Sequence, residues 1–332
     1  MEIYFPAYYE KFRCIAAACP DSCCKEWAVD VDDASAAFYR QLPGELGKRL
    51  QEVLVDTDDG TIMQIENGRC PMWQQDGLCR IHAELGHDAL CKTCREFPRL
   101  QHDYGNFIEL GLELSCPAAA QLILSGEDND LLAKNSPDSE APEYDMQVMQ
   151  ILQESRQQAF ELLDSDQYTL PEKLAILLLY CHAVQGQIDG GDAPAFHADN
   201  CLTIARKYAT QGDMNSIFTF FQSLEILTPN WKQRLSRSPA LPIWSMQLTA
   251  LARYLILRYW LQAISDFDLV CRVKLVIVAC LLVGALDGDP VQTAQLFSKE
   301  IENDPDNLDA IFAGAYNSTA LTDANLLGLL LH

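Results

Sequence analysis

Nine of the chain's 13 cysteines lie within the first 116 residues, and they are grouped rather than scattered. The groups, in chain order, are Cys14-x4-Cys19-x3-Cys23-Cys24, the single cysteines Cys70 and Cys79, the pair Cys91-x2-Cys94, and Cys116. Several thiolates gathered from nearby loops are the ligands that soft metal ions and iron–sulfur clusters prefer. The sequence therefore predicts a metal or cluster site in the N-terminal segment.

A disulfide framework is the alternative interpretation, and the compartment decides between the two. The N-terminus, Met1-Glu-Ile-Tyr-Phe-Pro, lacks a basic stretch followed by a long apolar one, so we expect no secretory signal and a cytoplasmic location. Thiols stay reduced there. The adjacent pair Cys23-Cys24 also favours metal binding, because neighbouring cysteines bridge to each other only through a strained ring.

Composition and charge exclude two classes of partner. The 332 residues are 49% hydrophobic, which is enough for a sizeable core. The formal net charge of −23, from 24 basic and 47 acidic residues, argues against nucleic-acid binding. The longest apolar run, Leu275 to Leu286, is too short to span a membrane and predicts a buried core helix.

The chain divides into three parts by composition. Residues 1–126 hold the cysteine groups and short elements, 127–145 form an acidic linker with two prolines, and 146–332 are helical nearly throughout. We predict a mainly α protein: a cysteine-rich N-terminal domain with short helices and loops around a metal centre, then an all-α C-terminal domain. The predicted N-terminal helices cover 33–39, 44–54 and 109–124, the last interrupted at Cys116-Pro117. A small hairpin is predicted to begin with the turn Asp58-Asp59-Gly60 and the strand 61–65, with Asn67-Gly68 as the next turn. The predicted C-terminal helices cover 146–163, 171–185, 194–209, 215–227, 243–265, 269–286, 290–301 and 306–316.

The number of thiols exceeds what one site needs. A tetrahedral zinc site or a cubane cluster takes four ligands, so either two centres form or several thiols are not ligands. Cys79-x2-His82 adds an imidazole to the candidates. The remaining cysteines sit singly inside apolar helices and are expected to pack in the core: Cys181, Cys201, Cys271 and Cys280.

The order and flanking residues of the cysteines resemble one family. The segments that carry the likeness are Phe12-Arg-Cys14 through Trp27, Gly68-Arg-Cys70-Pro, Gly77-Leu-Cys79-Arg-Ile, Cys94-Arg-Glu-Phe-Pro98-Arg99 and Leu114-Ser-Cys116-Pro117. Over about the first 125 residues the chain resembles the flagellin lysine-N-methylase family. It is more distantly similar to cysteine-cluster proteins described as zinc- or iron-chelating.

The resemblance implies an enzyme that transfers a methyl group from S-adenosylmethionine to lysines of flagellin, with an iron–sulfur cluster, 4Fe-4S in type, bound by cysteines. Carried over by position, the implied ligands are Cys14, Cys19, Cys23, Cys24, Cys70, Cys79, Cys94 and Cys116, and Cys91 is less essential to the pattern. Arg95 and Arg99 belong to the same signature, and we expect them to offset the negative charge of the thiolate centre, to bind the carboxylate of the methyl donor, or to cap loops. The Cys-x3-Cys-Cys run departs from the Cys-x3-Cys-x2-Cys of radical S-adenosylmethionine enzymes, which puts that arrangement in doubt.

Methyl transfer to an amine requires a neutral lysine, so a base is expected near the site. Four residues near the cysteines could serve, and the sequence selects none of them: Asp30, Asp32, Tyr104 and Glu113. Trp27 and Trp73 could wall the site or pack in the core.

Two other functions remain open on the sequence. A non-enzymatic protein that binds zinc or iron would carry the same thiols, as would an electron-transfer partner. A zinc protein would be colourless and free of sulfide, and an electron carrier would be reduced reversibly without methyl transfer.

Overall fold

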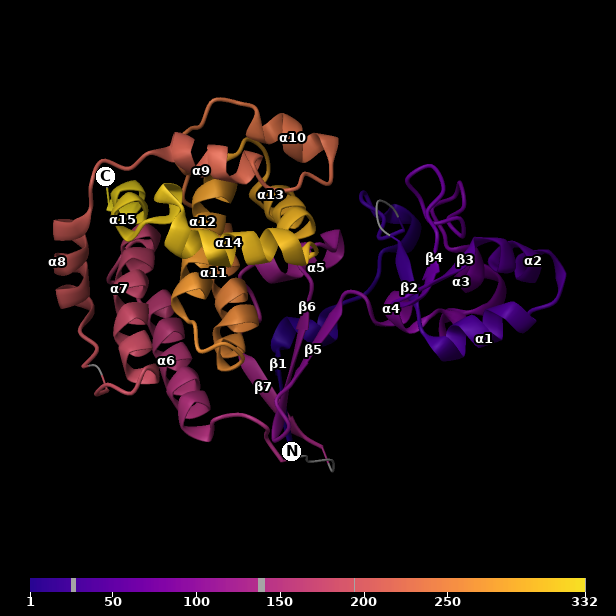
Figure 1. The fold of residues 1–332 in the computed structure, drawn as a ribbon, viewed down its shortest axis with the longest axis horizontal. Helices are drawn as coiled ribbons and strands as arrows, with labels where there is room; N and C mark the ends of the chain where they lie inside the picture. Colours follow the sequence, from indigo (N-terminus) through magenta and orange to yellow (C-terminus); the bar gives the residue numbers. More distant parts are fainter. Residues whose placement is uncertain (25–27, 137–140, 194, 332) are drawn as a thin grey trace.

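The computed structural model describes residues 1–24, 28–136, 141–193 and 195–331. Figure 1 shows two parts, a large helical body and a smaller lobe joined to one side of it. We call residues 13–98 the cysteine-rich lobe, and residues 1–12 and 99–331 the helical body. The chain thus begins in the body, crosses to the lobe and returns.

The lobe has a three-stranded antiparallel sheet in the order β2-β4-β3. Its strands are β2 (Val29–Val31), β3 (Leu54–Thr57) and β4 (Gly60–Met63), and its helices are η2 (Ala16–Ala18), α1 (Asp33–Gln41), α2 (Gly44–Val53), α3 (Arg80–Leu85), η3 (His87–Ala89) and α4 (Lys92–Glu96). Tyr39, Leu50 and Met72 are fully buried at the centre of the lobe's own hydrophobic core. Because four of the nine N-terminal cysteines also belong to this core or pack on it, the thiols lie close to the lobe's centre.

Local signals explain the lobe's elements. The Asp32 side chain accepts a hydrogen bond from the backbone N–H of Ser35 and so caps α1. The predicted helices over 33–39 and 44–54 are confirmed as α1 and α2. The predicted hairpin is confirmed as well, because β3 and β4 pair across a turn at Asp58 and Asp59.

The body carries a second sheet, four-stranded, in the order β5-β6-β1-β7. Its strands are β1 (Glu2–Pro6), β5 (Arg99–Asp103), β6 (Phe107–Leu112) and β7 (Leu131–Asn135). β1 runs parallel to β6 and antiparallel to β7, and β5 runs antiparallel to β6. β7 lies within the segment predicted as an acidic linker, where it pairs with β1 from Glu2 to Pro6.

Helices make up the rest of the body (Figure 1). They are η1 (Ala7–Lys11), α5 (Pro117–Leu124), α6 (Met146–Asp164), α7 (Leu170–Ile188), α8 (Ala198–Tyr208), α9 (Met214–Gln222), α10 (Pro229–Leu235), α11 (Met246–Tyr259), η4 (Trp260–Ile264), α12 (Val270–Ala285), α13 (Pro290–Phe297), η5 (Ser298–Glu302), α14 (Pro305–Asn317), η6 (Thr319–Leu321) and α15 (Asp323–Leu331). Nearly every residue of α12 is buried, and it packs against α7, α11, α13 and α14. The apolar run at 275–286 is therefore the predicted core helix.

The predicted fold class is confirmed as mainly α, with two corrections. The chain has two small sheets, and residues 109–112 belong to strand β6 rather than to a helix. β6 lies between β5 and β1 and is largely buried, including the charged Glu109, so its sequence lacks the regular alternation of a half-buried strand. The helices α10 and α15 were also not predicted.

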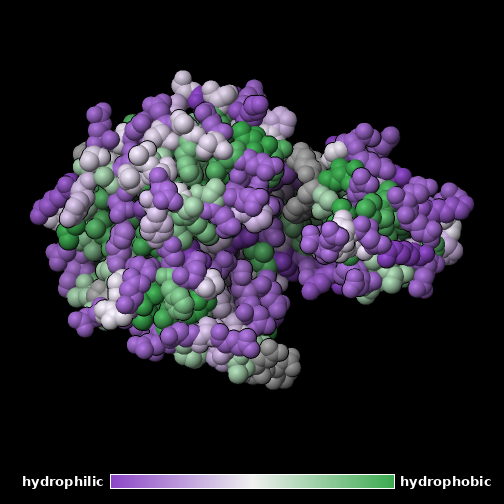
Figure 2. All heavy atoms as spheres, viewed as in Figure 1, coloured by the Kyte–Doolittle hydropathy of each residue, from purple (hydrophilic) through white to green (hydrophobic). Residues whose placement is uncertain are grey.

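The buried residues form two separate cores, one in the lobe and one that spans the body. The predicted domain boundaries at 126 and 145 stay a prediction. No helix among the described residues is both long enough and apolar enough to cross a membrane. On the face drawn in Figure 2, most of the surface is hydrophilic, with apolar side chains gathered in a few patches.

Candidate metal centre in the cysteine-rich lobe

Five thiols gather within the lobe, and we call them the lobe thiols: Cys24, Cys70, Cys79, Cys91 and Cys94. The backbone N–H of Cys70 donates to the carbonyl of Cys24 at 2.7 Å, which joins two segments that are far apart in sequence. Cys79 forms a β-bridge with Trp73 and is the N-cap residue of α3, while Cys91 is the N-cap residue of α4. Short elements that end at the same small core therefore bring these thiols together.

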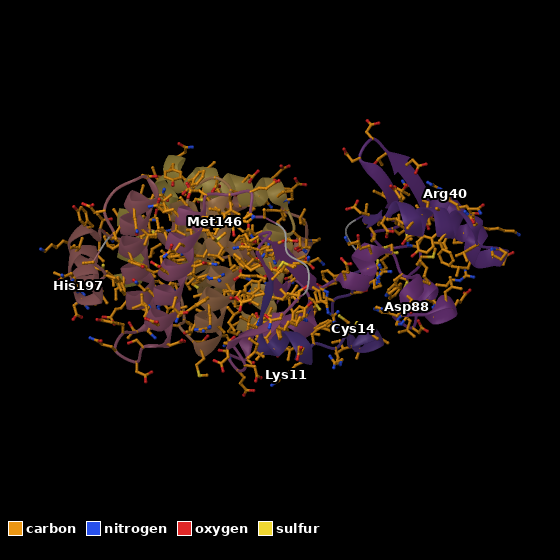
Figure 3. All side chains as sticks on the ribbon, turned by 90° about the horizontal axis from the view of Figure 1, so that it is seen from below. Lys11, Cys14, Arg40, Asp88, Met146 and His197 are labelled. Carbon is orange, nitrogen blue, oxygen red and sulfur yellow. The ribbon has the colours of Figure 1, made fainter. Side chains whose placement is uncertain are left out.

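The other four N-terminal thiols lie where the lobe meets the body, and we call them the junction thiols: Cys14, Cys19, Cys23 and Cys116. Figure 3 places Cys14 between the two parts, away from Arg40 and Asp88 on the lobe. Cys116 is buried in the body core, at the N-cap of α5. The two groups meet at the adjacent residues Cys23 and Cys24.

A glutamine of the body holds the cysteine loop in place. The Gln295 side chain, on α13, donates to a carboxylate oxygen of Asp21 at 3.0 Å and to the Ser115 carbonyl at 2.7 Å. The Lys299 ammonium lies 3.4 Å from the same carboxylate. These contacts set the loop that carries Cys19 and Cys23 beside the start of α5, although 274 positions separate Asp21 from Gln295.

The thiols influence one another's ionisation. Burial, with a smaller contribution from negative charge on Cys24, Cys79 and Cys91, raises the pKa of Cys70 to about 12. Burial likewise raises the pKa of Cys116, with Cys19 and Cys14 as charged neighbours.

Two thiol pairs share a hydrogen bond. The bond between Cys23 and Cys24 lowers the pKa of Cys24 to about 7 and raises the pKa of Cys23. The bond between Cys91 and Cys94 does the same, lowering the pKa of Cys91 to about 7. In each pair, one sulfur is thus favoured as a thiolate, which is the form that binds metals.

The donor set fits a soft metal or cluster by its chemistry. No disulfide joins the described cysteines, and thiolate sulfur is the kind of ligand that soft metals prefer. The side chains themselves are not arranged as ligands: in the described part of the chain, no three His, Cys, Asp or Glu side chains converge as they would around a metal ion. The predicted ligand roles of the eight cysteines therefore stay predictions. Cys91, which is less essential to the family pattern, lies among the lobe thiols.

The two signature arginines make local contacts. The Arg95 guanidinium donates to the Leu90 carbonyl at 3.3 Å. The Arg99 guanidinium lies 5.3 Å from the centre of the Phe12 ring, where the lobe joins the body. The Arg95 contact agrees with loop capping, and binding of a carboxylate by Arg95 and Arg99 stays a prediction.

The four candidate bases have different surroundings. Asp30 is exposed on β2, and Asp32 accepts hydrogen bonds from the backbone N–H groups of Lys92 and Ser35, which lower its pKa to about 2. Tyr104 stacks on Phe107 with ring centres 4.7 Å apart. Glu113 is half-buried, and burial raises its pKa. Asp32 thus serves as a helix cap that joins α1 to α4.

The aromatic and imidazole candidates near the cysteines have neighbours of their own. The Arg69 guanidinium lies 4.0 Å from the centre of the Trp73 ring. The His82 ring lies 6.0 Å from that of His87. Trp27 lies outside the described residues.

Fold and site together define a cysteine-cluster protein, in which a small thiol-rich lobe is attached to a larger helical body. No family model matches the chain, and no solved structure does. The flagellar biosynthetic protein FliU of Salmonella muenchen is 32% identical over 136 residues, which are 37% of this chain and 77% of that protein. The lysine-N-methylases of Salmonella typhimurium and Salmonella choleraesuis are each 31% identical over 144 residues, 40% of this chain.

The chain therefore belongs to the family that includes FliU and lysine-N-methylase. This agrees with the resemblance carried by the cysteine segments. The match spans about a third, 34%, of the length of each lysine-N-methylase.

Proposed function

We propose that the protein is a lysine N-methyltransferase that acts on flagellin and uses S-adenosylmethionine as methyl donor. The observation that supports this most strongly is the family membership, since two relatives are named lysine-N-methylase and a third is named a flagellar biosynthetic protein. The thiol-rich lobe is the second line of support, because the resemblance carried by the cysteine segments implies a methylase whose cysteines bind a cluster.

In this proposal, the cysteines bind an iron–sulfur cluster, of the 4Fe-4S type, with zinc as the alternative metal. The lobe thiols are the best candidates, because four of them belong to one small core or pack on it, Cys94 is hydrogen-bonded to Cys91, and a cubane needs four ligands. When bound, such a cluster supplies a redox-active centre and a site that can orient the methyl donor. Short helices and strands of the chain would position the sulfurs around the cluster. The hydrogen bond from Gln295 to Asp21 would hold the lobe against the body.

The methylation experiment compares the protein with two variants. Flagellin is expressed beside the protein, and its lysines are examined by intact-mass and peptide mass spectrometry. We expect mass increments of methyl groups on lysine with the unaltered protein, and loss of them with the double variant Cys70→Ser, Cys79→Ser. The matched control is Cys201→Ser, a half-buried thiol of α8 far along the chain from the N-terminal groups. Unmodified flagellin beside a metal-loaded, folded protein would count against the proposal.

A second candidate is a non-enzymatic protein that binds zinc or iron. The lobe has a hydrophobic core of its own, and a metal bound there would act only to stabilise the lobe. This observation favours the second candidate. The same preparation distinguishes the two. Stoichiometric zinc without sulfide, together with unmethylated flagellin, would support the second candidate.

A further inference from the structure

A groove on the helical body lies outside the thiol groups, at the far end of β5. It encloses about 600 Å³ and is lined by the end of β5 and the following turn, by residues 141–144, and by η4. The residues that carry the argument are His102, Asp103, Tyr104, Glu143 and Tyr144. Four of these five have no role in the proposed methylase chemistry, and the fifth, Tyr104, is one of the four candidate bases.

Two tyrosine rings form an aromatic corner in this groove. Tyr104 and Tyr144 meet edge to face with ring centres 6.5 Å apart, and Tyr104 stacks on Phe107 behind it. The Tyr144 hydroxyl donates to the Asn106 side chain at 2.5 Å, which fixes the ring. Rigid aromatic rings of this kind attract ammonium groups through their faces.

The titratable side chains that line the groove are acidic or neutral, while Arg258, which is not part of the lining, acts on His102. Asp103 and Glu143 are both exposed at its rim, and none of the described residues that line it is a lysine or an arginine. Burial and the positive charge of Arg258 lower the pKa of His102, so its imidazole is neutral at pH 7. A cation is therefore favoured over an anion in this groove.

Backbone geometry builds one wall of the groove. Gly105 has φ +79°, and a Cβ at this position would lie 3.1 Å from the Ala141 carbonyl oxygen and from Pro142 Cα. The absence of a side chain thus allows residues 141–144 to lie across the turn after β5. Asp103 accepts a hydrogen bond from the Gly105 N–H at 2.8 Å, which sets the turn.

An edge strand runs into the groove. β5 is the outermost strand of its sheet, and within the described residues no strand pairs with its other edge. Its residues Gln101, His102 and Asp103 line the groove. An extended peptide can add to such an edge by backbone hydrogen bonds while one side chain enters the neighbouring pocket.

We propose that the aromatic and acidic groove beside β5 is a docking site for a lysine side chain on an extended segment of a protein partner. The inference rests on the proposed function only for the identity of that partner, which is then the flagellin substrate. The groove would hold the substrate at a point on the body separate from the thiols.

The test measures binding of the full-length protein to a defined peptide, without a methyl donor. The probe is a fluorescein-labelled seven-residue peptide of alanine and serine with one central lysine, and its partner has norleucine in place of lysine. By fluorescence anisotropy we expect the lysine peptide to bind at least about tenfold more tightly than the norleucine peptide.

The deciding variant is Asp103→Asn, Glu143→Gln, which removes two exposed charges and keeps a side-chain oxygen that can accept the hydrogen bond from the Gly105 N–H. We expect it to lower the affinity for the lysine peptide about tenfold and to leave the norleucine peptide unaffected. The matched control is Asp58→Asn, Asp59→Asn, which removes two exposed charges from the β3–β4 turn. Tyr104→Ala should weaken binding of the lysine peptide as well.

Equal affinity of the charge variant and the unaltered protein for the lysine peptide would overturn the inference. The two proposals can fail separately. Lysine-dependent binding in the groove without any methylation of flagellin would support the docking site and contradict the methylase. Methylation of flagellin with an unchanged KM in the charge variant would support the methylase and contradict the docking site.

Discussion

At the scale of single residues, the body depends on a buried ion pair. The Arg156 guanidinium on α6 donates to both carboxylate oxygens of Glu109 on β6, and each side chain is less than a tenth exposed. Desolvating the two charges offsets much of their attraction, so the pair contributes little net stability relative to apolar residues. Removing only one partner should destabilise the protein, because the other charge then stays buried without a counter-charge.

We therefore expect Arg156→Met to lower the free energy of unfolding by about 3–5 kcal/mol. The double variant Arg156→Met, Glu109→Leu should recover most of that loss, since no uncompensated charge remains. Urea unfolding followed by circular dichroism measures both. A single variant within about 0.5 kcal/mol of the unaltered protein, the size of an ordinary surface substitution, would contradict this account.

At the scale of elements, the cysteine loop is positioned by the turn at Gly77. This residue has φ +83°, and a Cβ there would lie 3.2 Å from the Cα of Ala17, within the loop between Cys14 and Cys19. Gly68 provides a natural comparison. It has φ +74°, but a Cβ there would meet no atom within 4 Å.

Both Gly77→Ala and Gly68→Ala should lose about 1 kcal/mol of stability, because alanine disfavours a positive φ. Only Gly77→Ala should also displace the loop and lower the amount of metal bound per chain. Elemental analysis of both variants purified in parallel gives the comparison. Equal metal content in the two variants would show that the contact with Ala17 does not position the thiols.

The last helix, α15, is held by a charged cluster that responds to acid. The Asp323 carboxylate lies 2.7 Å from the His182 imidazole and 2.8 Å from the Lys274 ammonium. Burial alone would raise the pKa of Asp323, but hydrogen bonds from His182 and Lys274 lower it to about 2. A depressed pKa means that this stabilisation is present above the ordinary pKa of about 3.9 and is lost as the pH falls towards 2.

Asp323→Asn should therefore be less stable than the unaltered protein at pH 5, and the difference should shrink as the pH falls from 4 to 2. Urea midpoints of the two proteins, measured at matched pH values, test this. A difference that stays constant over that range would mean that the charge of Asp323 does not stabilise α15.

At the scale of the whole molecule, the sequence predicts which segments are thiol-rich and which are helical better than it predicts how the strands pair. The cysteine spacing, the helix caps and the apolar run of α12 are local signals, and they indicated the thiol-rich lobe and the helical body. The pairing of β1 with β6 and β7 joins residues about a hundred positions apart, and no local pattern encodes it.

The same reason explains what was missed at the site. The eight predicted cysteines and Cys91 lie in two neighbouring groups, the lobe thiols and the junction thiols. The group to which each cysteine belongs depends on the path of its loop, which the spacing does not predict. The contacts of Gln295 with Asp21 and Ser115 carried no sequence signal, because an isolated glutamine in a helix has many ordinary roles.

The central claim is that the N-terminal thiols bind a soft metal centre in a protein of the lysine-N-methylase family. Anaerobic purification, followed by visible absorption and by iron, acid-labile sulfide and zinc analysis of one sample, tests it most directly. The account predicts about four iron and four sulfide per chain and a broad visible absorption, as for a cubane cluster. A colourless protein with neither iron nor zinc, its thiols all titratable in the folded state, would contradict it.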